Sequence, residues 1–462
     1  MNSIFIPRLV VTGLSGGAGK TINSLGLVRA WTEAGRSVAP FKKGPDYIDA
    51  SWLGLAAGRP AANLDPYFME PATIRSLFAH RAQGGDIAVI EGNRGLFDGM
   101  DVDGSCSTAE LARILDAPVL LSMDCTKMTR TAAAILSGIA GFEDGVRLGG
   151  VILNRTASDR HRSILTRAIE QYTDVPVLGA LPKISPDPIP ERHMGLISNR
   201  EFDGQDGILA NLARIMRENC DLDRIWDLAS SAGELSGVAP LWPQAPKPAE
   251  VTIGYVRDAA LWFYYEENLE ALARAGAHLV ELSLLDNAPW PEIHGLYLGG
   301  GFPETLAEEL AARADMGERV RSLSEAGLPI YAECGGFMFL TESVTWNGKT
   351  WPMAGVLPVR TDLCARPHGL GYVRAQVVAE NPYHPLGSTL IGHEFHYSQC
   401  LSNTPAGSLP MALRMERGTG MLAGFDGFMV RNTFACYTHI HALGTPWWAE
   451  NFVQAAKSWK EG

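Results

Sequence analysis

The sequence predicts an α/β protein of two domains, the first of which is built on a parallel β-sheet. Three observations lead to this fold class. Short apolar runs alternate with helical stretches through the first half, a glycine-rich loop stands between the first run and the first helix, and a proline-rich segment precedes a second α/β pattern. A chain of 462 residues is also too long for one ordinary hydrophobic core.

The expected strands of the first domain are continuous apolar runs of about five residues, which is typical of strands buried on both faces of a sheet. In chain order they are RLVVTG, SVAPFK, DIAVIEG, APVLLSMD, GGVILN and VPVLGALP. Helical segments such as TAAAILSGIAGF and RHRSILTRAIEQY lie between them. Ligands of such sheets bind beyond the carboxyl ends of the strands, so the polar residues there mark the expected site.

We expect a first domain over 1–235, an extended linker over 236–250 and a second domain over 251–462. The linker SGVAPLWPQAPKPAE contains four prolines and little periodicity. The second domain begins with VTIGYVRD, continues through GLYLGGG and LPIYAECGG, and becomes richer in short strands after about residue 351.

Composition and charge exclude several classes of protein. The chain is 46% hydrophobic and carries a formal net charge of −12, which argues against nucleic-acid binding through a basic surface. Its seven cysteines are scattered without a CxxC pair, so neither a disulfide framework nor a zinc finger is indicated. No apolar run approaches the length of a membrane helix, and the N-terminus lacks a signal-peptide layout. We therefore expect a cytoplasmic protein without a membrane partner.

The stretch VTGLSGGAGKT, residues 11–21, has the features of a phosphate-binding loop. Its glycines allow the backbone N–H groups to turn toward a phosphate, and the next helix points its positive end at the same place. Lys20 would reach the outer phosphates of ATP and Thr21 would bind Mg²⁺. The expected nucleotide-binding residues are Gly16, Gly17, Gly19, Lys20 and Thr21, with Asn154 and Arg155 placed to contact the base.

The loop is one residue longer than the usual pattern, because five residues separate Gly13 from Gly19. This spacing resembles the dethiobiotin-synthetase branch of the phosphate-loop proteins. The partition-ATPase branch shares it, but has a second lysine where this chain has Ser15. The resemblance implies transfer of the γ-phosphate to a carboxylate-like group.

Carboxylates follow two of the expected strands. Glu91 ends the third strand, and Asp46 lies in PFKKGPDYID after the second. With Thr21 they form an expected Mg²⁺ site, since Mg²⁺ favours a few carboxylates together with phosphate oxygens. Helix capping or a turn is the alternative role for each carboxylate.

The segment PIYAECGGFMFL predicts a strand, a sharp turn and a helix with Cys334 at the apex. Such an elbow presents a nucleophile and lets Gly335 donate a backbone N–H to an oxyanion. The glycine turn in YLGGGFPE supplies Gly300 as the second expected donor. These residues resemble the triad (class I) glutamine amidotransferases. The resemblance implies that Cys334 attacks the glutamine amide and that His439 transfers the proton.

The triad is incomplete in this sequence. The family places a glutamate two residues after the catalytic histidine, and that position is His441 here. The third role is therefore unfilled or supplied elsewhere. Another motif, GHEFHYS at 392–398, lacks the His-Glu-x-x-His spacing of zinc proteases, and in a strand its two histidines would face opposite sides.

The two halves together resemble the cobyrinate a,c-diamide synthase family over nearly the whole chain. The supporting stretches include GPDYIDASWLGLAAGRPAANLDPYFM, EGNRGLFDG, GVILNRTASDRHRSIL, PERHMGL, LYLGGGFPE and GHEFHYS. The resemblance implies amidation of the c and a acetate groups of a corrinoid with ATP, Mg²⁺ and glutamine. Leu53 departs from the pattern, which has a histidine there. The substrate is a polyanion, so its expected contacts are Lys42, Lys43, Arg94 and Arg192.

Two alternatives stay open at this point. The same chemistry could act on sirohydrochlorin, with or without nickel, or on hydrogenobyrinic acid. A non-catalytic nucleotide sensor with an inactive glutaminase domain is the alternative of another class, supported only by the missing glutamate. A homodimer is also compatible with the sequence.

Overall fold

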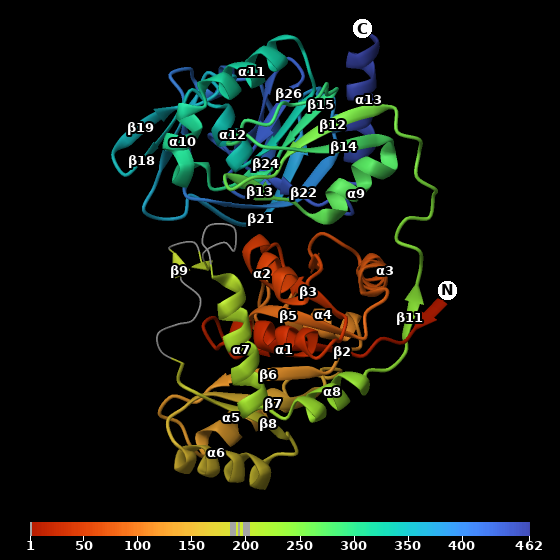
Figure 1. Ribbon diagram of the computed structural model, residues 1–462, viewed down its shortest axis with the longest axis vertical. Coiled ribbons are helices and arrows are strands. Elements are labelled where there is room, and N and C mark those ends of the chain that lie inside the picture. Colours follow the sequence, from red (N-terminus) through yellow and green to blue (C-terminus); the bar gives the residue numbers. More distant parts are fainter. Residues whose placement is uncertain (1, 185–190, 193–194, 197–203) are drawn as a thin grey trace. The chain divides into compact units, whose positions relative to one another are not determined.

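The computed structural model describes residues 2–184, 191–192, 195–196 and 204–462. Its chain divides into two compact units, Met1–Pro243 and Gln244–Gly462. Figure 1 shows the first unit in red to yellow-green and the second in green to blue. Among the described residues, no helix has both the length and the apolar character that crossing a membrane requires.

The first unit is built on a seven-stranded sheet in which every pairing is parallel, as the apolar runs predict. The strand order is β4-β3-β5-β2-β6-β7-β8. Their bounds are β2 Arg8–Gly13, β3 Val38–Lys43, β4 Ala62–Leu64, β5 Ile87–Gly95, β6 Val119–Asp124, β7 Leu148–Thr156 and β8 Val177–Pro182.

Eight helices of the described residues accompany this sheet: α1 Lys20–Glu33, α2 Tyr47–Ala57, α3 Pro71–Ala82, α4 Thr108–Ile114, α5 Thr131–Ala140, α6 Asp159–Tyr172, α7 Gln205–Asn219 and α8 Leu222–Ser230. Helix α1 packs against α7 and α2, and α5 packs against α6. Apolar residues of β6 and β7 pack with those of α5 and α6 in one hydrophobic cluster. The strands are thus buried, which explains their continuous apolar runs.

Three two-stranded sheets lie outside the larger sheets in the described part of the chain. In the first unit, β1 Asn2–Ile4 pairs with β11 Leu235–Val238, and β9 Glu191–Arg192 pairs with β10 Gly195–Leu196. Residues 236–238, expected in the linker, therefore belong to a strand of the first unit. In the second unit, β13 Leu261–Phe263 pairs with β16 Gly300–Gly301.

The second unit is built on a mixed ten-stranded sheet of order β14-β12-β15-β17-β26-β25-β24-β21-β22-β27. The first five strands are parallel and the remaining pairings are antiparallel. Their bounds are β12 Val251–Val256, β14 Ala277–Leu282, β15 Gly295–Leu298, β17 Ile330–Glu333, β21 Gly369–Val377, β22 Thr389–His396, β24 Met411–Arg417, β25 Phe425–Val430, β26 Thr433–Cys436 and β27 His439–Ile440.

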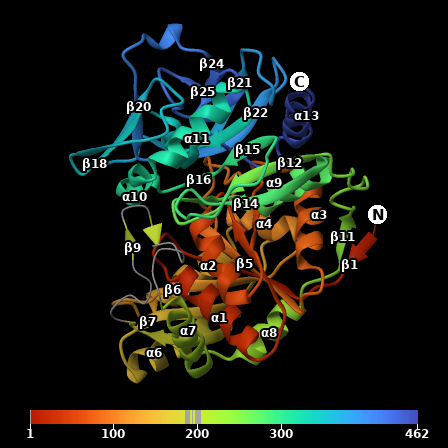
Figure 2. The ribbon, with the colours of Figure 1, turned by 45° about the horizontal axis from the view of Figure 1, so that its top comes forward.

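A four-stranded sheet and the helices surround this larger sheet (Figure 2). The smaller sheet contains β18 Ser343–Trp346, β19 Lys349–Pro352, β20 Arg360–Leu363 and β23 Ser398–Leu401. The helices are α9 Glu266–Ala275, α10 Ala307–Ala312, α11 Ala314–Glu325, α12 Gly335–Leu340 and α13 Trp448–Glu461, with short 3₁₀ turns at Pro303–Leu306 and Ala406–Ser408. Strands β17 and β26 end side by side, with Glu333 opposite Cys436, so their carboxyl ends bring the elbow next to the histidine segment.

Candidate active site

The glycine-rich loop connects the end of β2 to the start of α1, as its sequence predicts. Gly19 caps α1 in the left-handed conformation, with φ 87° and ψ 18°. A Cβ atom at this position would lie 2.3 Å from Nδ2 of Asn154. Gly16 and Gly17, by contrast, would meet no atom within 4 Å. The loop is therefore tightly packed at the helix start and open at the expected phosphate side.

Lys20 and Thr21 occupy the first turn of α1. The ammonium group of Lys20 donates to the carbonyl of Ser15 at 3.1 Å, which keeps its side chain folded over the loop. Burial lowers the pKa of Lys20, and the nearby charge of Lys42 lowers it further. The hydroxyl of Thr21 donates to Oε1 of Glu91 at 2.8 Å. Phosphate oxygens would supply the counter-charge that the Lys20 ammonium needs in this buried position.

Glu91 lies at the centre of a buried charge cluster. Its Oε1 accepts from Thr21 and from the ammonium group of Lys42, which also contacts Asp49. Burial raises the pKa of Glu91, whereas Lys42 lowers it. Burial lowers the pKa of Lys42, but the charges of Asp49 and Glu91 outweigh it and raise that pKa overall. The cluster therefore holds Lys42 as a cation between two carboxylates, of which Glu91 also accepts from Thr21.

The oxygen atoms at this place fit a magnesium ion. Glu91 Oε2 is buried without a hydrogen-bond partner in the described part of the chain, and the Thr21 hydroxyl lies beside the same carboxylate. Hard oxygen ligands of this kind are those that Mg²⁺ prefers. Asp46 has a different contact, because its Oδ1 accepts from the backbone N–H of Asp49 and caps α2. Burial raises the pKa of Asp46 to about 7, with Asp49 as the next cause.

The four cations expected to bind substrate have unequal surroundings. Lys42 is 2% exposed and is paired with Asp49 and Glu91, so its charge is already compensated inside the protein. Lys43 is also buried, at the end of β3. Arg94 is exposed on the segment after Glu91. Arg192 lies in β9, and its side chain falls outside the described part of the molecule.

Asn154 and Arg155 follow the buried part of β7. Asn154 donates through Nδ2 to the carbonyl of Ala18 at 2.8 Å and to Ser122 at 2.6 Å. Its Oδ1 is buried and accepts no hydrogen bond from the described residues. The backbone of Arg155 is in the left-handed region, with φ 57°, and its guanidinium pairs with Asp124 at 2.6 Å. Asn154 therefore ties the phosphate loop to β7 and retains one free acceptor.

Cys334 stands at the elbow between β17 and α12, and its backbone is strained. Its φ of 46° and ψ of −99° lie outside the regions that non-glycine residues normally adopt. Such strain costs on the order of 1–3 kcal/mol and tends to accumulate at functional sites. The Cys334 side chain is 5% exposed, and burial raises the pKa of its thiol, with Glu304 as the next cause. A base is therefore required to form the thiolate.

The two expected oxyanion donors lie near this elbow. The N–H of Gly335 hydrogen-bonds toward the Cys334 thiol, and α12 begins at the same residue. A Cβ atom on Gly335 would lie 2.8 Å from the backbone nitrogen of Gly301. At Gly300, a Cβ atom would lie 2.5 Å from Cε1 of His439. Only glycines let these backbone segments approach so closely.

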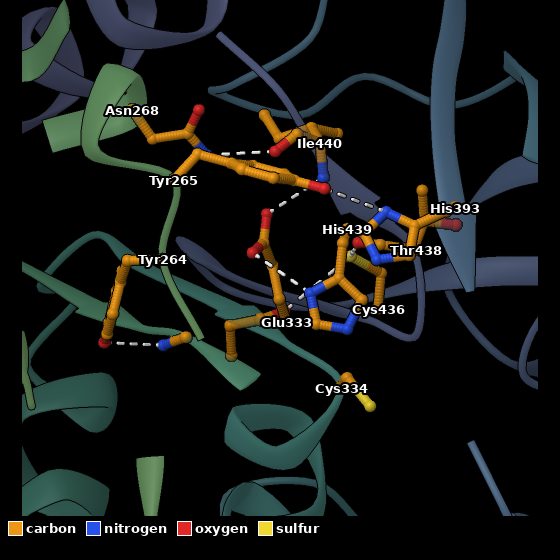
Figure 3. A network of polar contacts seen from close by, with 12 residues as sticks. Tyr264, Tyr265, Asn268, Glu333, Cys334, His393, Cys436, Thr438, His439 and Ile440 are labelled. Atoms are coloured by element: carbon orange, nitrogen blue, oxygen red, sulfur yellow. Dashed lines mark hydrogen bonds and ion pairs between the residues drawn. The ribbon is translucent and has the colours of Figure 1, made fainter. Parts of the chain in front are cut away.

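His439 is the first residue of β27 and is buried. Its Nδ1 lies 3.6 Å from Oε2 of Glu333, the last residue of β17. In Figure 3 the imidazole lies between the Glu333 carboxylate and Cys334, with its other nitrogen on the Cys334 side. His441, two residues on, instead has its Nε2 3.5 Å from Glu267. The structure thus brings Cys334, His439 and an acidic residue together, and that acid directly precedes the cysteine.

Residues 392–396 of the GHEFHYS segment form the end of β22, where the two histidines have different neighbours. The His393 ring stacks on His439 with centroids 4.8 Å apart and planes inclined by 16°. Burial lowers the pKa of His393 well below its ordinary value, and His439 and His441 add to the effect. His396 stacks on Tyr437 and contacts the carbonyl of Ser398 through Nδ1. His393 is therefore a neutral partner of the catalytic candidate.

Sequence reasoning singled out neither Glu333 nor His393 as a site residue. An acidic residue at the end of the strand before a nucleophile was the available signal for Glu333. His393 was visible only as part of a motif without a role. Pairing of β22 with β27 sets His393 opposite His439, and strand pairing over that sequence distance has no local signature.

Comparison with known proteins gives a consistent result for both units. Residues 9–196 match the family described as the CobQ/CobB/MinD/ParA nucleotide binding domain, and residues 252–447 match the CobB/CobQ-like glutamine amidotransferase domain. Curated relatives include a cobyrinate a,c-diamide synthase of Magnetococcus marinus, 42% identical over 99% of this chain and 98% of the relative. Proteins of the same name from Archaeoglobus fulgidus and Dehalococcoides mccartyi are 38% and 39% identical, each with 98% of both chains covered.

Proposed function

The chain belongs to the cobyrinate a,c-diamide synthase family of glutamine-dependent, ATP-using amide ligases, and from this we propose that it amidates the a and c acetate groups of cobyrinic acid. The observation that carries the proposal is the strained Cys334 elbow beside His439, in a chain that also has the Lys20–Thr21 phosphate loop. One unit would release ammonia and the other would activate the carboxylate.

The glutaminase reaction begins with proton transfer from the Cys334 thiol to Nε2 of His439. The thiolate attacks the side-chain amide carbon of glutamine, and the N–H groups of Gly335 and Gly300 hold the oxyanion that forms. When the C–N bond breaks, the His439 proton goes to the leaving nitrogen and ammonia is released. Water then hydrolyses the thioester to glutamate and returns the thiol.

The ligase reaction begins with attack of a substrate carboxylate oxygen on the γ-phosphate of ATP. The bond to the β-phosphate oxygen breaks, and ADP and an acyl phosphate form. Ammonia then attacks the acyl carbon and inorganic phosphate leaves, which gives the amide. Lys20 would hold the outer phosphates and Asn154 the base. Thr21 and Glu91 would hold Mg²⁺, which neutralises phosphate charge when bound, while Lys43, Arg94 and Arg192 would attract the anionic substrate.

The experiment is to incubate the purified protein with cobyrinic acid, Mg²⁺-ATP and glutamine and to count amidations by mass. We expect two, each adding one amide to the substrate. Hydrogenobyrinic acid and sirohydrochlorin, with and without nickel, are assayed in parallel. Faster double amidation of one of those rings than of cobyrinic acid would replace the proposed substrate.

The Cys334→Ala variant separates the two reactions. It should release no glutamate from glutamine but should still amidate cobyrinic acid with ammonium chloride, because the ligase unit is unchanged. A parent protein that neither hydrolyses glutamine nor uses ammonium would contradict the proposal and favour a nucleotide sensor.

A further inference from the structure

The catalytic histidine of a nucleophile–histidine site needs a partner that fixes its ring and tautomer. In this chain the position two residues after His439, which would supply an acid, is His441. That side chain cannot take the role, because it is a histidine and its own ring is engaged elsewhere. Its Nδ1 accepts from the backbone N–H of Leu443 and its Nε2 faces Glu267.

Glu333 has the position that the role requires. Its Oε2 lies 3.6 Å from Nδ1 of His439, and both side chains are buried. The same oxygen accepts from the Tyr297 hydroxyl at 3.1 Å, and Oε1 accepts from the backbone N–H of Ile440 at 3.3 Å. Figure 3 shows the carboxylate between Ile440 and the imidazole of His439. The orientation of the Glu333 carboxylate is thus fixed by the backbone of Ile440, which follows His439 in the chain, and by the Tyr297 hydroxyl.

The donors around Glu333 are themselves held in place. Asn268 donates to the Tyr297 oxygen and to the carbonyl of Ile440, and its own carbonyl accepts from Ala442. Burial raises the pKa of Tyr297 well above its ordinary value, and Glu333 adds to the effect, so the phenol remains a donor. This network clamps the 440–442 segment, which contains His441 and directly follows His439.

We propose that Glu333 is the positioning residue for His439, replacing the acid that the sequence lacks after that histidine; the inference rests on the proposed glutamine hydrolysis. With the carboxylate 3.6 Å from Nδ1, the tautomer that carries its proton on Nδ1 is favoured, which leaves the lone pair of the neutral imidazole at Nε2, on the Cys334 side. When His439 takes the thiol proton, the adjacent negative charge stabilises the imidazolium. His393, stacked on the ring and neutral, restricts its rotation without repelling that charge.

The test compares Glu333→Gln with the parent in the full-length protein. We expect kcat for glutamine hydrolysis to fall about a hundredfold or more, because the amide can hold the wrong tautomer, while KM for glutamine changes little. Amidation of cobyrinic acid with ammonium chloride should keep its parent rate. In ¹⁵N-histidine NMR spectra, the His439 signals should show the Nδ1–H tautomer in the parent and a changed tautomer balance in the variant.

Glu267→Gln is the matched control, since it makes the same change in another buried glutamate–histidine pair, that of Glu267 with His441. We expect it to keep kcat for glutamine hydrolysis within about twofold of the parent, so that a loss in Glu333→Gln reports positioning rather than the removal of a buried charge. The inference is overturned if Glu333→Gln keeps its kcat, or if both variants lose it equally.

If the Glu333→Gln protein does not fold, a further variant tests the positioning role instead. Glu333→Asp keeps the charge but shortens the side chain by one methylene, and it should lower kcat at unchanged KM for glutamine. An unchanged kcat in Glu333→Asp would then overturn the positioning role. If the parent itself released no glutamate while still amidating with ammonium, the glutaminase half of the proposed function would fail as well.

Discussion

The ammonium group of Lys42 lies 2.8 Å from Oε1 of Glu91, and both side chains are almost completely buried. The Thr21 hydroxyl donates to the same carboxylate oxygen. The pair therefore couples strands β3 and β5 of the first unit to the start of α1, the helix that follows the phosphate loop. A charge introduced or removed here changes the environment of the expected Mg²⁺ site directly.

Glu91→Gln is expected to weaken Mg²⁺ binding, because it removes one negative charge from the Thr21–Glu91 pair. The Mg²⁺ concentration for half-maximal ammonium-dependent amidation should rise at least about tenfold. Glutamate release from glutamine should stay within about twofold of the parent. Cys334→Ala is the complementary control with the opposite pattern, and an unchanged Mg²⁺ requirement in Glu91→Gln would remove Glu91 from the metal site.

Gly19→Ala should weaken ATP binding through two effects. The position has φ 87°, and a new Cβ would meet the Asn154 amide at 2.3 Å. Gly58→Ala is the matched control, since its φ is 67° but nothing lies within 4 Å of the added atom. Both variants pay about 1 kcal/mol of backbone strain, whereas only Gly19→Ala should raise the KM for ATP about tenfold or more. Equal KM values for the two would show that the Asn154 contact has no effect.

ATP should be preferred over inosine triphosphate. Asn154 uses Nδ2 within the protein and retains Oδ1 as an acceptor, which suits the 6-amino donor of adenine but not the 6-oxo group of inosine. One such hydrogen bond is worth about 1 kcal/mol, which predicts a kcat/KM about fivefold higher for ATP. The two nucleotides differ only at the N1 and C6 positions of the purine, so equal kcat/KM values would exclude a hydrogen bond between the 6-amino group and Asn154.

The second unit should lose stability in acid because His384 is buried as a neutral ring. Trp447 can only donate to His384 Nδ1, at 3.4 Å, so the ring proton lies on Nε2, which contacts the Tyr331 hydroxyl. Burial lowers the pKa of His384 to about 3. In the unfolded chain a histidine titrates near about 6.5. Between these values the unfolded chain binds one more proton, so the free energy of unfolding decreases as the pH falls from about 6.5 to 3.

The His384 contribution to this slope is at most about 1.4 kcal/mol per pH unit. His384→Gln should reduce the slope by up to that amount, because glutamine does not titrate. Urea unfolding of the parent and the variant at pH 7, 5.5 and 4.5, followed by tryptophan fluorescence, measures the difference. Parallel pH profiles for the two proteins would contradict the assignment.

Local sequence patterns predicted the strands of the first unit well, since each buried parallel strand is a continuous apolar run with a glycine, proline or polar residue at its end. Strand β4 was not predicted, because Ala62–Leu64 is too short to show a pattern and contains a polar residue. The phosphate loop and the cysteine elbow were also predicted from local patterns. Each of these turns places glycines and a reactive or charged residue at consecutive positions of the sequence.

The sequence was less able to predict which groups pair with the charged residues. Lys42 was expected to contact an anionic substrate, but its ammonium group is paired with Asp49 and Glu91. Asp46 was expected at the metal, and its carboxylate caps α2. In each case the sequence located a charge at the right edge of the sheet. Which other charge compensates it depends on side-chain directions that only the packed strands and helices define.

The sequence by itself determined the two-unit α/β plan, the phosphate loop and the candidate nucleophile and histidine, because each of these is recognised from residues close to it in the chain. Only the tertiary structure decided that Glu333 faces His439 and that Glu267 faces His441. The members of these pairs are more than a hundred residues apart, and the parallel pairing of β17 with β26 brings Glu333 next to the histidine segment. A carboxylate in water has no preferred cation, whereas one buried between strands must be compensated by whatever the fold places beside it.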